Sequence, residues 1–145
     1  MRSKEFLDRL DHKRIVAAIA AAEAKTSGEI RIYLQRGEVA GDALPVAEKK
    51  FHELGMTKTR ERNAVLIFVA PRAQKFAVIG DEGVHQKCGA EFWERLVGEM
   101  QAHFKSEKFT EALLHGITNA GDLLGRFFPR GPGDRNELPD AVIEE

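Results

Sequence analysis

The sequence contains a single cysteine, Cys88, among its 145 residues. One cysteine cannot form an internal disulfide, and it cannot supply the several thiolates of a structural zinc site. The chain also lacks an excess of either charge, since 22 basic residues oppose 23 acidic ones. Nonspecific nucleic-acid binding would therefore lack its main electrostatic contribution, so nucleic acid is not an expected partner. Stability must come from an apolar core.

Long hydrophobic runs are absent as well. The longest candidate, residues 64–71, has the length of a strand and is too short to cross a bilayer. The first ten residues interleave charged and apolar side chains, without the continuous apolar region of a secretory signal. We therefore expect no membrane partner and a cytoplasmic location.

The length of the chain indicates one domain, because about 150 residues is typical of a single folding unit. We expect this domain to occupy residues 1–130. Residues 131–145 are rich in turn-forming and acidic residues, and we expect them to form a loosely held acidic tail.

Hydrophobic periodicity divides the domain into helices and strands. Apolar residues recur at helical spacing in four segments, whereas three short segments are rich in β-branched residues. The predicted helices cover residues 11–25, 42–54, 84–104 and 109–128, and the predicted strands cover 29–35, 63–70 and 75–80. The last helix contains Gly116, Gly121 and Gly125. Each glycine costs up to about 1 kcal/mol relative to alanine, so we expect close packing there.

The order of these elements brings three distant segments to one edge of the sheet. A right-handed helical crossover makes the strands at 29–35 and 63–70 parallel, so that both begin at the same edge. The strand at 75–80 returns antiparallel as a hairpin, and it delivers Gly80 and Asp81 to that edge beside Glu29 and Asn63. The amino ends of the parallel strands therefore form a polar rim.

Oxygen ligands for a hard cation gather at this rim. Glu29, Asp81 and Glu82 supply carboxylates and Asn63 supplies an amide oxygen, which are groups that Ca²⁺ and Mg²⁺ prefer. The last helix returns towards the same end and would bring Asp122 near as a further ligand. His85, four residues after Asp81, is the one histidine of five that would reach the rim.

An alternative for the rim is a network of ion pairs. Arg31 and Arg62 lie close enough in sequence to the strand starts to pair with these acids. The segment Asp81-Glu82-Gly83 also suits a turn and a helix cap before it suits anything else.

The opposite edge of the sheet offers a second place for a ligand, because open α/β sheets usually bind ligands at the carboxyl ends of parallel strands. The loop over residues 35–42 lies there. The spacing of Gly37 and Gly41 fits neither a dinucleotide-binding turn nor a P-loop, so the pattern favours a plain flexible loop.

Common catalytic motifs are absent from the sequence. A cysteine phosphatase loop requires arginine six residues after the nucleophile, but Glu94 stands six residues after Cys88. The histidines form no metal-binding pair, and no serine lies in a Gly-x-Ser-x-Gly turn.

Several short motifs resemble those of one family, in order and in spacing. They are Ser27-Gly28-Glu29-Ile30, Arg62-Asn63-Ala-Val-Leu-Ile, Phe76-Ala-Val-Ile-Gly80-Asp81-x-Gly83, Phe92-Trp93, Gly-Asp-Leu-Leu before Phe128-Pro129, and Asn136-Glu137-Leu138-Pro139-Asp140. Together they resemble the TPM domain family, also called the thylakoid acid phosphatase-like family, in its short soluble branch. The match covers nearly the whole chain.

The resemblance implies a three-layer α/β/α sandwich around a small mixed sheet. It also implies a cleft, lined by the Ser-Gly-Glu, Arg-Asn and Gly-Asp motifs, that binds a divalent cation, usually calcium. Carried over to this chain, the expected ligands are Glu29, Asp81 and Asp122, with Glu82 as a weaker candidate. Arg62, Asn63, Gly80 and His85 would support the cleft.

Three functions are consistent with these residues. The first is a Ca²⁺-responsive binding or regulatory module that presents a surface to a protein partner. The second is a weak metal-assisted phosphatase, in which Arg62 would hold a small phosphate ester and a rim carboxylate or His85 would move protons. The third is a structural domain without a metal. We rank binding above catalysis, because the sequence offers no identifiable nucleophile.

Overall fold

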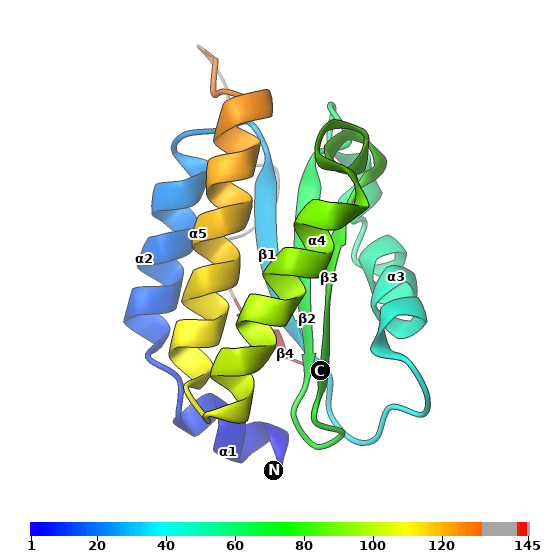
Figure 1. The fold of residues 1–145 in the computed structure, drawn as a ribbon, viewed down its shortest axis with the longest axis vertical. Coiled ribbons are helices and arrows are strands. Elements are labelled where there is room, and N and C mark those ends of the chain that lie inside the picture. The colour runs from blue at the N-terminus through cyan, green and yellow to red at the C-terminus, as the bar shows by residue number, and fades with distance from the viewer. Residues whose placement is uncertain (132–141, 145) are drawn as a thin grey trace.

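The computed structural model describes residues 1–131 and 142–144, and Figure 1 shows its helices on both sides of a sheet. The helices are α1 (Ser3–Asp8), α2 (His12–Glu23), α3 (Ala43–Glu53), the 3-10 helix η1 (Met56–Lys58), α4 (Glu82–Lys105) and α5 (Phe109–Phe127). The strands are β1 (Glu29–Leu34), β2 (Ala64–Ala70), β3 (Lys75–Gly80) and β4 (Val142–Glu144).

The sheet is mixed, and its strand order is β3-β2-β1-β4. β1 and β2 are parallel and are joined by α3, whereas β2 and β3 form an antiparallel hairpin. These features confirm the predicted crossover and hairpin. β4 pairs in parallel with β1, from Ile32 to Leu34. This strand was not predicted, because a three-residue strand gives too short a pattern to recognise within a turn-rich tail.

Two apolar clusters fill the spaces on either side of the sheet. One joins α2, α4 and α5 to the β1 and β2 side chains of one parity, including Ile30, Ile32 and Ile67. The other joins α3 to the side chains of opposite parity, including Leu66 and Phe68. Successive strand residues point to opposite faces, so strands buried on both sides read as continuous apolar runs. The three-layer α/β/α sandwich is confirmed.

The close packing expected around the last helix is also present. A Cβ atom added to Gly121 of α5 would lie 2.6 Å from the Cβ of Ala22 on α2. One added to Gly116 would lie 2.8 Å from the Cε of Met100 on α4. These glycines therefore let α5 lie directly against both of its neighbours.

Three details of the helices differ from the sequence predictions. α1 and η1 were missed, since six and three residues are too few for a helical period to stand out. α4 begins at Glu82, earlier than expected, because Asp81 caps it. It also bends at Gly89, whose φ is 73° and ψ is 176°. Within residues 1–131 and 142–144, no helix combines the length and apolarity needed to cross a membrane.

Candidate functional site

The starts of β1 and β2 and the end of β3 meet at one edge of the sheet, as the sequence predicted. Glu29 and Ala64 are direct partners across the parallel pair. The N–H of Asp81 donates to the carbonyl oxygen of Ala64 at 2.9 Å. Three strand ends therefore bring Glu29, Ala64 and Asp81 into one row. We call Glu29, Arg62, Asn63, Asp81 and Glu82 the rim.

Three of the rim side chains are buried although they are polar. The exposed fraction is 1% for Glu29, 1% for Asn63 and 5% for Asp81. Burying a charged or polar group is costly unless it gains hydrogen bonds or an opposite charge. The contacts of each rim residue therefore decide whether the rim is a structural network or a binding site.

Asp81 begins α4. Its backbone is extended, with φ at −65° and ψ at 169°, and its Oδ1 accepts a hydrogen bond from the N–H of Glu82 at 2.8 Å. An aspartate in this position satisfies one of the free N–H groups of the first helical turn and interacts favourably with the helix dipole. The capping role that the sequence left open is thus real.

Arg62 holds the same carboxylate from the solvent side. Its Nε donates to Oδ2 of Asp81 at 2.8 Å and its Nη2 donates to Oδ1 at 2.9 Å. A third nitrogen, Nη1, lies 3.4 Å from Oε1 of Glu82. The hydrogen bonds to Asp81 raise the pKa of Arg62 above its ordinary value. A two-pronged pair of this kind is among the stronger charge-assisted contacts in proteins.

The backbone at Arg62 is shaped to make this pair. Its φ is 52°, in the left-handed region that residues with a side chain seldom occupy. The carbonyl oxygen of Arg62 accepts the N–H of Gly83 at 3.0 Å. A Cβ added to Gly83 would lie 2.5 Å from the carbonyl oxygen of Glu61 and 2.6 Å from that of Arg62. The backbone just before β2, at Glu61 and Arg62, therefore contacts the backbone at the start of α4, and only glycine fits at residue 83.

Asn63 ties the starts of the two parallel strands together. Its Nδ2 donates to Oγ of Ser27 at 3.1 Å, and its backbone N–H donates to Oγ1 of Thr59 at 3.2 Å. Ser27 belongs to the Ser-Gly-Glu motif that the resemblance placed in the cleft, whereas Thr59 was missed as a site residue. The available signal for Thr59 was its position just before β2, where a hydroxyl side chain can complete backbone hydrogen bonds.

A second group of charges lies where α2 ends beside β1. Glu23, 2% exposed, accepts the N–H of Ile30 through Oε2 at 2.8 Å. Arg31 is also buried, and this burial lowers its pKa, while the charges of Glu29 and Glu23 act in the opposite direction. Glu23 was missed, although its position four residues after Ile19 on the apolar face of α2 was a usable signal.

The expected set of four carboxylate ligands does not assemble in this conformation. Within residues 1–131, no group of three or more His, Cys, Asp or Glu side chains is arranged to hold a metal ion. Glu82 is 63% exposed and contacts Arg62, while His85 is exposed on the first turn of α4.

Asp122 lies exposed on α5, and its place in a ligand set stays a prediction. Two of its neighbours on α5 face inward: Gly121 packs on α2, and Leu124 lies against Gly28. Residue 122 falls on another side of the helix. The motif at residues 136–140 and most of the predicted tail lie outside the described residues, whereas residues 142–144 of that tail form β4.

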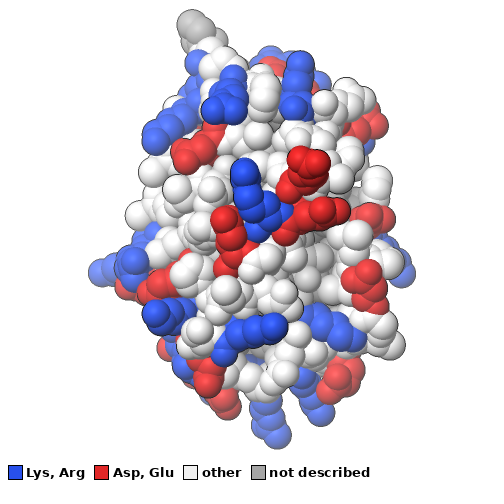
Figure 2. Space-filling model, in the orientation of Figure 1, with Lys and Arg blue, Asp and Glu red and all other residues white. Residues whose placement is uncertain are grey.

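The surface around the site shows no field of one sign. Figure 2 shows acidic and basic side chains intermixed over the face formed by α2, α4 and α5. This pattern agrees with the net charge of −1 and offers no continuous basic surface for a phosphate backbone on that face.

The motifs that build this rim belong to a known family. The model of the TPM domain matches residues 1–123 of the chain. The protein belongs to the TPM domain family. Among solved structures, this TPM domain is similar to the NMR structure of BA42 protein from the psychrophilic bacterium Bizionia argentinensis. The sequence identity is 36%, the match covers 92% of each chain, and the TM-score is 0.83. A search of curated proteins finds no match.

Proposed function

We propose that this TPM domain is a divalent-cation-binding module whose rim carboxylates bind Ca²⁺, or more weakly Mg²⁺, in competition with Arg62. The observation that supports the proposal is the position of the Arg62 guanidinium. It neutralises Asp81 and Glu82 from the solvent side, with the shortest contact at 2.8 Å. The rim therefore already favours a cation at this place, and the bound cation is a side chain of the protein itself.

Exchange of the guanidinium for a metal ion is physically reasonable because the two partners differ in mobility. The Arg62 side chain is 38% exposed and can swing into water, whereas Asp81 is 5% exposed and is fixed by its cap to α4. Glu82 is exposed and can follow the ion. With so few protein oxygens, water would complete the six to eight ligands of Ca²⁺.

The proposal implies weak binding. Ca²⁺ affinity depends on the number of charged ligands and on the rigidity of the site, and the weakest natural modules have Kd values of about 10⁻⁴–10⁻³ M. We place this domain at that end, because the ion must displace a two-pronged arginine pair. Release of Arg62 would change the charge pattern beside α4, and this change would serve as the signal to a protein partner.

We favour binding over the phosphatase alternative. Arg62 is the residue expected to hold a phosphate ester, but its guanidinium already donates hydrogen bonds to Asp81 and Glu82. A phosphatase reaction would also need an activated nucleophile within reach of that phosphate. Burial raises the pKa of the Cys88 thiol, which makes the reactive thiolate scarcer at neutral pH.

The test is a calcium titration of the wild type beside three single variants, read by melting temperature and by calorimetry. Arg62→Gln removes the competing cation and should bind Ca²⁺ more tightly than the wild type. Asp81→Asn keeps a capping side chain but removes the charge, and it should lose the binding. Arg72→Gln is the matched control, because Arg72 also forms an arginine–carboxylate pair, with Glu38 at 3.2 Å, but outside the rim.

Two results would contradict the proposal. One is the absence of any calcium-dependent stabilisation at millimolar metal in both the wild type and Arg62→Gln. In that case the rim acids are only partners of Arg62, and the structural alternative holds. The other is an equal gain in affinity for Arg62→Gln and Arg72→Gln, which would reflect net charge and not a site at the rim.

A further inference from the structure

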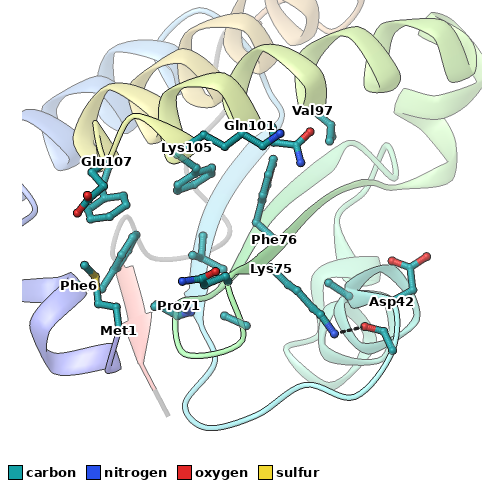
Figure 3. A pocket seen from close by; sticks show the side chains of 17 residues that line it. Met1, Phe6, Asp42, Pro71, Lys75, Phe76, Val97, Gln101, Lys105 and Glu107 are labelled. Atoms are coloured by element: carbon teal, nitrogen blue, oxygen red, sulfur yellow. Dashed lines mark hydrogen bonds between the residues drawn. The ribbon is translucent and has the colours of Figure 1, made fainter.

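A cavity of about 720 Å³ lies away from the rim, where β2 ends and β3 begins (Figure 3). Its walls come from α1, the loop before α3, the β2–β3 hairpin, the last turns of α4 and the start of α5. It therefore borders the carboxyl end of β2, one of the two strands joined by the crossover. Open α/β sheets place small-molecule sites at such ends, and volumes of about 300–1,000 Å³ are usual for them.

Four phenylalanines from four elements form a continuous series of rings along the cavity. Phe76 of β3 lies 4.7 Å from Phe104 of α4, Phe104 lies 6.4 Å from Phe109 of α5, and Phe109 lies 5.0 Å from Phe6 of α1, measured between ring centroids. Phe76, Phe104 and Phe109 are each only partly buried. The apolar surface that they leave open would favour an apolar ligand, because covering it removes it from water.

The acids of the cavity already have partners in the protein. Asp42 caps α3, since its Oδ1 accepts the N–H of Leu44 at 3.1 Å. Glu107 pairs with Arg9, with Oε1 2.9 Å from Nη1, and the Arg9 guanidinium in turn lies 4.6 Å from the centroid of the Phe109 ring. Of the two carboxylates, Glu107 is therefore neutralised by a cation of the protein, and Asp42 is engaged as a helix cap.

The two lysines of the cavity have no carboxylate partner in the described part of the chain. Lys75 donates through Nζ to the carbonyl oxygens of Val39, at 2.8 Å, and Gly41. Lys105 is exposed on α4 and makes no ion pair with any described residue. In Figure 3 Lys105 extends along α4 beside Gln101, above the cavity, and Lys75 reaches towards the loop before α3. The cavity is therefore bordered by two lysine ammonium groups that no described carboxylate neutralises.

We propose that this cavity binds an anionic amphiphile, a single carboxylate on an unbranched aliphatic chain. The chain lies along the series of four rings, and the carboxylate meets Lys105 and the side-chain amide of Gln101. This site is separate from the rim and does not depend on cation binding there. No sequence motif indicated this site, because its residues come from five elements. The one indication was the general rule that ligands bind at the carboxyl ends of parallel strands.

The experiment uses decanoate as the probe, with decanol and decyltrimethylammonium as matched chains of neutral and positive head group. Amide chemical shifts of the isotopically labelled protein are followed below the micelle concentration. We expect decanoate to bind most tightly and to move the amides of Phe76 and of residues 101–109. Lys105→Gln should weaken decanoate binding about three-fold, the scale of an exposed ion pair. Lys108→Gln should leave it unchanged, since Lys108 is also exposed but does not line the cavity.

A second variant tests the apolar half of the proposal. Phe104→Ala removes the central ring and should weaken decanoate and decanol alike, which a loss of charge would not do. Its fold is checked by the shifts of amides far from the cavity. Equal binding of decanoate and decyltrimethylammonium, shifts confined to other surfaces, or no binding at all would each overturn the proposal. Decanoate binding that persists in Arg62→Gln and Asp81→Asn would separate this site from the rim.

Discussion

The two ends of the sheet differ in how far their side chains are engaged with one another. At the rim, the charged side chains of Arg62, Asp81 and Glu82 are joined to one another by hydrogen bonds. At the cavity, four partly covered or buried rings and two lysines border a space of about 720 Å³ that no described residue fills. The rim is closed by its own contacts, while the cavity is left open.

This difference has a consequence for mutations. A group that is fully used by its neighbours cannot be removed without leaving a partner unsatisfied, which costs stability. Lys105, exposed at the edge of the cavity and without an ion pair to a described residue, leaves no such partner behind, and its removal affects mainly what binds there. We therefore expect rim substitutions to act on folding, and cavity substitutions to act on ligand affinity.

The largest expected effect is that of Gly83→Ala. The added Cβ would lie 2.5 Å from the carbonyl oxygen of Glu61, a backbone atom that can move only together with the approach to β2. Overpacking of this kind costs typically 1–3 kcal/mol, so the midpoint of urea unfolding should fall clearly. Gly98→Ala, also in α4 but with open space around it, should instead raise stability by up to about 1 kcal/mol. Equal effects of the two would refute the close approach at Gly83.

The second largest effect is expected for Asp81→Ala. This change removes the cap of α4, which is worth about 1 kcal/mol, and leaves Arg62 without its main acceptor. Asp81→Asn retains an oxygen that can cap the helix and should lose less stability. The difference between the two variants, measured by urea unfolding, gives the contribution of the cap together with the hydrogen bond that the same oxygen accepts from Arg62. If both variants unfold at the wild-type midpoint, the rim does not stabilise the fold.

Arg62→Gln should change stability less than either of these substitutions. Its guanidinium is 38% exposed, and water can replace the hydrogen bonds that it makes with Asp81. The melting temperature should fall slightly at low salt and less at high salt, because salt screens the lost attraction. A fall as large as that of Gly83→Ala would mean that the rim cannot release Arg62, and the exchange with a metal ion would then be implausible.

The smallest effect on stability is expected for Lys105→Gln at the cavity. Lys105 is exposed and has no ion pair with a described residue. The melting temperature of Lys105→Gln should therefore match those of the wild type and of Lys108→Gln. The comparison fails if this variant is as unstable as Asp81→Ala, because the cavity would then be part of the structural network.

The sequence was a good guide wherever one segment carried its own pattern. The apolar runs of β2 and β3 and the periodicity of α5 predicted the elements, and the crossover rule then placed Glu29, Asn63 and Asp81 at one edge. The residues of the rim were thus found without any side-chain geometry.

The sequence was a poor guide wherever contacts depend on rotation or on distant partners. Asp122 was expected at the rim, and its spacing in the sequence could not tell that it lies exposed on α5 while Gly121 packs on Ala22. The pairing of Arg62 with Asp81 was one of two alternatives, and sequence spacing alone could not decide between a pair and a metal site. The series of four rings depends on residues from four elements, which no local pattern joins.

One titration tests the central claim, that the rim binds a cation by releasing Arg62 while the cavity at the other end binds separately. Amide spectra of the labelled protein are recorded with increasing Ca²⁺, and then with decanoate added. The account predicts that Ca²⁺ moves the amides of Glu29, Asn63 and residues 81–84, together with the Arg62 side-chain Nε signal, and leaves Phe76 and residues 101–109 unmoved until decanoate arrives. An Arg62 Nε signal that stays unchanged while Ca²⁺ shifts other residues, or no shift at all at millimolar Ca²⁺, would contradict it.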